Sequence, residues 1–126
     1  MSWVEGTVTE FGRGMGIDGF AFNAHGVASL VSETLGSLFL ERLDGAVLIY
    51  LVRPLDRPVG DALQRALDAC HWKHNRPFLA TPGLRHEVDL LFAVRLADGE
   101  FDLPTLERVI SLLDQLHREV REGVPA

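Results

Sequence analysis

The residue types most capable of chemistry stand at positions 70–74, where the sequence reads Cys-His-Trp-Lys-His. A thiol and two imidazoles at this spacing could hold a metal ion, and a cysteine with a histidine could act as a nucleophile. Structural zinc normally needs four such ligands, and His25, His86 and His117 stand in scattered contexts. No oxyanion loop or third group accompanies Cys70. We therefore interpret the segment as the end of a surface helix and Cys70 as a small apolar side chain.

Two other patterns are weak candidates for catalysis. Gly12, Gly14 and Gly16 look like a phosphate loop, but a dinucleotide fingerprint opens a helix, whereas these glycines follow a helical pattern and indicate its end. The carboxylates between positions 56 and 102 fall in expected turns, caps and exposed helix faces. The sequence therefore predicts no enzyme activity, no cofactor and no metal site.

The composition of the chain favours a protein-binding role. A length of 126 residues with 47% hydrophobic residues predicts a single domain over residues 1–126. A mean hydropathy of +0.11 is high for so small a domain and suggests apolar surface left for a partner. The net charge of −6 argues against binding to nucleic acid, which needs a basic face.

The expected location is the cytoplasm. One cysteine excludes an internal disulfide framework and fits a reducing compartment. The first residues lack the basic start and the apolar core of a signal peptide, and no apolar run approaches the roughly 20 residues that span a bilayer.

The elements that would position these residues follow from hydrophobic periodicity. The pattern predicts helices over 2–15 (with Ser2 as N-cap), 59–71 and 102–123, and strands over 26–33, 37–43, 46–53 and 88–96. A short extended piece is expected over 78–80, followed by a turn at Thr81, Pro82 and Gly83. In the strand 88–96, Val88 is expected to share one face with Leu90, Phe92, Val94 and Leu96. The order α-β-β-β-α-β-β-α predicts an α+β fold, an antiparallel sheet with helices packed on one face.

The second face of this sheet is also apolar. The strand 47–52 is apolar on both faces, Phe39 lies opposite its neighbours Leu38 and Leu40, and Leu91 lies opposite Leu90. Three helices cover one face well, so another chain could cover the rest. The alternative is that 47–52 is simply the central strand, or that a helix wraps further round.

The helix 59–71 allows two interpretations. Leu63 and Leu67 form one face, and a line of small residues runs beside it at Ala62, Ala66 and Ala69. A leucine face beside small side chains suits a helix that a partner approaches closely, but alanine is also common in an ordinary core helix. Trp72 and Phe78 flank the helix as possible interface anchors.

The order of these segments resembles the small class I type III secretion chaperones. The likeness rests on the run 11–17 (Phe-Gly-Arg-Gly-Met-Gly-Ile), the strands 26–31 and 47–52, and the helical segment 61–67. The start, Met-Ser-Trp-Val-Glu, is most similar to the SycN-type member of that family.

This resemblance implies a dimer, either with a second small secretion chaperone or with itself, that uses neither ATP nor metal. An extended N-terminal region of a secreted gatekeeper protein would wrap around it, with at most peripheral contact with the membrane export apparatus. The implied dimer contacts are Leu63, Ala66, Leu67, Cys70 and Phe78. The implied client contacts are Trp3, Val4, Leu30, Phe39 and Leu91. The alternatives are a homodimer serving a different effector and a small enzyme or ligand-binding α+β domain.

Overall fold

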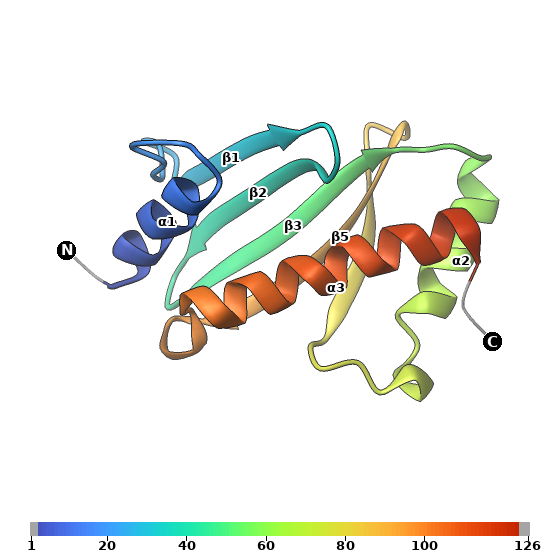
Figure 1. Cartoon of the computed structure of the whole chain (residues 1–126). Helices are drawn as coiled ribbons and strands as arrows, with labels where there is room; N and C mark the ends of the chain where they lie inside the picture. The colour runs from blue at the N-terminus through green and yellow to red at the C-terminus, as the bar shows by residue number, and fades with distance from the viewer. Residues whose placement is uncertain (1–2, 124–126) are drawn as a thin grey trace.

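The computed structural model describes residues 3–123, and within this range it has the predicted order of helices and strands (Figure 1). The helices are α1 (Trp3–Gly14), α2 (Val59–Ala69) and α3 (Leu103–Glu122), with 3-10 turns at Trp72–His74 and Asp98–Glu100. The strands are β1 (Val27–Ser32), β2 (Gly36–Leu43), β3 (Ala46–Pro54), β4 (Ala80–Arg85) and β5 (Asp89–Ala97). The predicted N-cap Ser2 lies outside the described residues. No helix in the described range has the length and apolar content needed to cross a membrane.

The five strands form one antiparallel sheet in the order β1-β2-β3-β5-β4. A tight turn at Asp44 and Gly45 joins β2 to β3, and Gly45 adopts the positive φ of 72° that such a turn requires. Because β5 returns beside β3, β3 is the central strand and β1 and β4 are the edges. This position is one reason why β3 reads as apolar on both faces.

The three helices cover one face of the sheet, as predicted (Figure 1). Side chains of the strands on this face, such as Leu40, Ile49 and Phe92, pack in one core with the apolar stripe of α3. The N-cap Asp102 starts α3 by accepting a hydrogen bond from the backbone N–H of Thr105. No helix of residues 3–123 packs on the opposite face of the sheet, so we call it the open face.

Two predictions about the hairpin of β4 and β5 are wrong. Thr81, Pro82 and Gly83, which were expected to form a turn, lie inside β4, and an edge strand accepts Pro82 because one side of it bonds no neighbour. The turn instead falls at His86 and Glu87, whose φ angles are 54° and 59°. Val88 follows this turn and is exposed, so it does not share the buried face of β5.

The glycines at 12, 14 and 16 were predicted to end the first helix, and α1 ends at Gly14, one residue before the predicted end at Met15. Gly12 is required for packing: a Cβ built there would lie 2.1 Å from Cβ of Phe20, which is buried against the helix. The chain leaves the helix at Gly16, which has a φ of +82°.

Candidate protein-binding surfaces

Helix α2 packs on the body of the protein through its small residues. Ala62, Ala66 and Ala69 are fully buried, whereas Leu63 is half-buried and Leu67 is 57% exposed. Alanine side chains let α2 approach α3 and β4 closely, and the leucines are left on the outer side of the helix. This corrects the expectation that Ala66 contacts a partner, because its side chain already lies in the core.

Three arginines tie the α2 region to the last turn of α3. Arg57 and Arg65 donate hydrogen bonds to the carbonyl oxygens of residues 121 and 120, at 2.9 and 3.2 Å. Arg76 donates to the carboxylate of Glu119 at 2.5 Å and to the carbonyl oxygen of Ala69 at 3.1 Å. Each of the residues 119–121 therefore accepts a hydrogen bond from one arginine side chain. These bonds hold α2 in place, although its alanine face buries little area.

The exposed leucine face of α2 continues into the segment that follows it. Trp72 is 84% exposed and Leu79 is 86% exposed, while Cys70 and Phe78 are half-buried. The guanidinium of Arg108 lies 5.5 Å from the centre of the Phe78 ring. We call the residues of this segment with accessible apolar side chains the α2 surface: Leu63, Leu67, Cys70, Trp72, Phe78 and Leu79.

The thiol and imidazoles of this segment make local contacts. Burial raises the pKa of the Cys70 thiol to about 11, so it is protonated at neutral pH and a poor nucleophile. Nδ1 of His71 accepts a hydrogen bond from the backbone N–H of Lys73, and Nε2 of His74 bonds the carbonyl oxygen of Asp68. Among residues 3–123 there is no group of three or more side chains placed to hold a metal ion.

A second group of exposed apolar side chains lies around α1 and β1, at the end of the molecule away from α2 in Figure 1. Its members, which we call the α1–β1 surface, are the exposed side chains Trp3, Met15, Ile17 and Val31. Of the predicted client contacts, Trp3 lies here, but Val4 and Leu30 are buried in the core, because α1 and β1 turn those side chains towards the sheet and helices.

The free edge of β1 lies within this surface. The backbone N–H of Arg42 donates to the carbonyl oxygen of Gly26 at 2.7 Å, so Ala28 and Leu30 are the next residues of β1 to bond β2. By the alternation of an antiparallel ladder, the backbone groups of Ser29 and Val31 point away from the sheet. Val31 is 83% exposed, so this edge offers both backbone hydrogen bonds and an apolar side chain.

The two remaining predicted client contacts, Phe39 and Leu91, meet on the open face of the sheet. Both are half-buried and line one shallow hollow. The ring of Phe39 stacks on Tyr50 with centroids 4.9 Å apart, and the guanidinium of Arg85 lies 5.1 Å from the centre of the Phe39 ring. A flat aromatic surface with a cation beside it suits contact with another chain.

Sequence reasoning missed Met15, Ile17, Val31 and Leu79 as exposed apolar residues. A signal for Val31 was present, since it alternates with the core residue Leu30 in one strand and therefore faces the other way. No comparable signal exists for Leu79, because its exposure depends on where β4 joins the sheet.

Comparison with solved structures identifies the same fold in several protein complexes. The ExsC–ExsE complex matches with a TM-score of 0.76 and 18% identity, covering 100% of this chain and 99% of that chain. The HopA1–SchA chaperone–effector complex matches with a TM-score of 0.68 and 20% identity, covering 93% and 91%. The Yersinia pestis type III secretion chaperone SycH, in complex with a fragment of YscM2, matches with a TM-score of 0.68 and 14% identity, covering 90% and 97%.

Structural matches at 14–20% sequence identity show only that the fold is shared. The family is shown instead by a match between the sequence and a family model. No curated protein matches the chain. The family model described as type III secretory system chaperone SycN matches residues 3–121, which is nearly the whole chain. The chain therefore belongs to the SycN family of type III secretion chaperones.

Proposed function

We propose that this protein is one subunit of a cytoplasmic chaperone dimer that holds the extended N-terminal region of a secreted protein before export. The observation that carries the proposal is the apolar surface that the fold leaves uncovered, since the helices cover one face of the sheet and exposed apolar side chains remain at both ends. Binding of this kind needs no catalysis and no cofactor.

The α2 surface is the proposed dimer contact. Its leucines point outward because alanines do the packing, and Trp72 and Leu79 add large side chains whose exposure is costly in an isolated subunit. A dimer of ordinary size buries about 1,600 Å² in total, which a leucine face, two aromatics and their rim can reach. Similarity to the SycN-type subunit favours a second small chaperone as the partner, and a self-dimer is the alternative.

The α1–β1 surface and the open face are the proposed client contacts. An extended client can add a strand to the free edge of β1, where backbone bonds supply affinity and side-chain pockets supply selectivity. Phe39 and Leu91 would then contact apolar side chains of the client. The family suggests a secreted gatekeeper protein as this client, and another effector is the alternative.

The dimer proposal predicts that Leu67→Asp gives a folded monomer. Leu67 is more than half exposed, so an aspartate there costs the subunit little but places an unpaired charge in the dimer contact. Light scattering after co-expression with a second small chaperone measures the mass. Ser29→Asp, which adds the same charge on β1 at the opposite edge of the sheet, should leave the dimer intact. An unchanged mass for Leu67→Asp would show that α2 is not the contact.

The client is identified by mass spectrometry of the proteins that co-purify with this chaperone from its native host. A secreted gatekeeper together with a second small chaperone supports the proposal in full. A stable self-dimer that ignores the second chaperone and holds another effector supports the alternative. Recovery of a chaperone dimer with no secreted protein would refute the client proposal.

A further inference from the structure

A hollow of about 290 Å³ opens beside the last turn of α3, at a place that the proposed dimer and client contacts do not use. Its walls come from the β1–β2 turn, the end of β3 and the loop after it, the start of α2, the start of β5 and the end of α3. The large apolar side chains of the lining are Leu35, Pro54, Leu55, Leu90 and Val120, and Ala62 lies beside them. This volume suits one or two side chains better than a large cofactor.

His117 also lines this hollow, although it is only 5% exposed. Its Nε2 lies 2.8 Å from the carbonyl oxygen of Leu51, and because a carbonyl only accepts, Nε2 carries the hydrogen. Burial lowers the pKa of His117 to about 4, so the ring is neutral at pH 7 and Nδ1 is an acceptor.

Nδ1 of His117 has no hydrogen-bond partner among the described residues. Among residues 3–123 every fully enclosed side-chain nitrogen or oxygen has a hydrogen-bond partner. Nδ1 of His117 is therefore not fully enclosed, and the hollow is the space that His117 lines. An acceptor at the wall of a partly apolar hollow can receive a hydrogen bond from a ligand with an N–H or O–H group.

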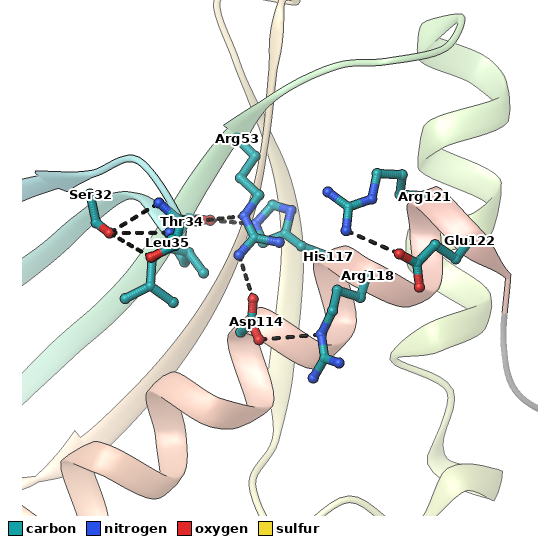
Figure 2. Close-up of polar contacts among 10 residues, drawn as sticks. Ser32, Thr34, Leu35, Arg53, Asp114, His117, Arg118, Arg121 and Glu122 are labelled. Carbon is teal, nitrogen blue, oxygen red and sulfur yellow. Dashed lines mark hydrogen bonds and ion pairs between the residues drawn. The ribbon is translucent and has the colours of Figure 1, made fainter.

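Both arginines that line the hollow are already paired, as Figure 2 shows. Arg53 contacts Asp114 at 2.5 Å and also donates to the carbonyl oxygen of Leu35, and Arg121 contacts Glu122 at 3.1 Å. An anionic ligand would therefore find both lining arginines already engaged. The chemistry favours a neutral donor next to an apolar group, which is what an extended polypeptide presents at each residue.

A second apolar hollow of about 280 Å³ lies on the other side of Leu35, between α1 and α3. Phe11, Met15 and Ile110 line it, and Leu35 belongs to both hollows. From Ile110 to His117 and Val120, α3 advances roughly 10–15 Å. Four residues of extended chain cover about 13 Å and bring their side chains back to the same face. One peptide crossing Leu35 could therefore fill both hollows, which a small ligand could not.

We propose that the hollow beside His117 is a docking slot for an extended polypeptide segment, which inserts one apolar side chain, donates a hydrogen bond to Nδ1 of His117, and places a second apolar side chain about four positions away in the hollow across Leu35. The inference rests on the proposed function, because the segment would belong to the client. It specifies what that client carries at this site.

The direct test uses short blocked peptides of serine and threonine that carry two leucines, titrated into protein labelled with ¹⁵N in its histidine rings. Leucines about four positions apart should bind and shift the Nδ1 resonance of His117, whereas an odd spacing, which puts them on opposite faces of an extended chain, should bind more weakly. Binding that leaves Nδ1 of His117 unmoved, or no binding at either spacing, overturns the slot.

Two variants test the slot with the client itself. Ala62→Leu fills the hollow from its wall, and Thr34→Trp covers it from an exposed lining position. Each should weaken client binding about tenfold to a hundredfold, the worth of one buried apolar side chain. Gln115→Trp adds the same bulk on the exposed side of α3, outside both hollows, and should change nothing.

The outcomes separate the slot from the proposed function. If the unmodified chaperone holds its client and a folded Thr34→Trp variant holds it equally well, the slot is refuted and the chaperone function stands. If no client is held at all, the chaperone function fails, and the peptide titration still decides whether the slot binds polypeptide.

Discussion

His117 is one of three buried polar residues in the described range, with Thr7 and Glu119. Its ring packs edge-on against Phe92 with centroids 4.9 Å apart, and its Nε2–H satisfies the carbonyl oxygen of Leu51 on the central strand. Burial disfavours the charged ring, and Arg53 and Arg121 act in the same direction. The fold therefore depends on a neutral histidine at this position.

This dependence predicts a loss of stability in mild acid. The pKa of His117 is about 4 in the folded protein against an ordinary 6.5, so the unfolded chain binds the proton more tightly. The contribution of the neutral His117 ring to the free energy of unfolding is fully present above pH 6.5. It falls by roughly 3 kcal/mol as the pH drops towards 4. Urea unfolding between pH 7.5 and 4.5 measures this slope.

His117→Gln is the comparison for that measurement. A glutamine keeps an N–H donor for Leu51 but does not titrate, so the difference in unfolding free energy between the two proteins should shrink as the pH falls from 6.5 to 4.5. Parallel curves for the two proteins would contradict the assignment.

The position of α2 illustrates how one element is held on the fold. The last carbonyl groups of α3 have no partner inside their own helix, and arginine side chains can both satisfy them and stabilise the negative end of the helix dipole. Arg57 and Arg65 bond such carbonyl groups, and Arg76 pairs with the carboxylate of Glu119 nearby. The leucine face of α2 is thereby presented in a fixed orientation.

Arg76→Met is expected to release α2 and to destabilise the protein by about 3–5 kcal/mol, because the buried Glu119 loses its counter-charge. Chemical denaturation measures the loss, and faster amide hydrogen exchange across α2 reports the release. Arg118→Ala is the matched control: Arg118 forms an exposed pair with Asp114, and its removal should cost about 0.5 kcal/mol or less. Equal effects of the two changes would show that Arg76 is an ordinary surface residue.

In the molecule as a whole, the two apolar surfaces lie at opposite edges of the sheet. The α1–β1 surface borders the edge strand β1, and α2 packs beside the other edge strand, β4. Because the surfaces do not overlap, one subunit can contact a partner chaperone and a client simultaneously.

This separation predicts that Phe39→Glu leaves the fold and the dimer intact but weakens client retention. Phe39 lies on the open face, away from α2, and a glutamate there replaces an aromatic contact with a charge that the client must desolvate. Pull-down of the client and light scattering of the dimer provide the two readouts. Gln115→Glu adds the same charge on the exposed side of α3 and should retain the client. Full retention by Phe39→Glu would remove Phe39 from the client contacts.

Periodicity predicted most of the fold because each helix and strand buries one continuous apolar face. It failed at β4, where Pro82 and Gly83 read as a turn, because only the assembled sheet makes that segment an edge strand.

The candidate surfaces were predicted in part. Leu67 and Trp3 are exposed as expected, whereas Ala66 and Val4 are buried, because the side of a helix that packs depends on its neighbours. The hollow at His117 is built from five separate segments, so no local pattern could show it.

The strand order has a consequence for the reach of a client. Five strands spaced about 4.8 Å apart place the edges of one sheet roughly 20 Å from each other. Two subunits joined at their α2 ends would hold their β1 edges at the far limits of the pair, on the order of 50 Å apart. A polypeptide touching both edges must then run for at least about 15 residues without folding on itself. The pair would thus select clients by the length of their unstructured segment. Compact proteins would not reach both edges, whereas proteins with a long unstructured leader would.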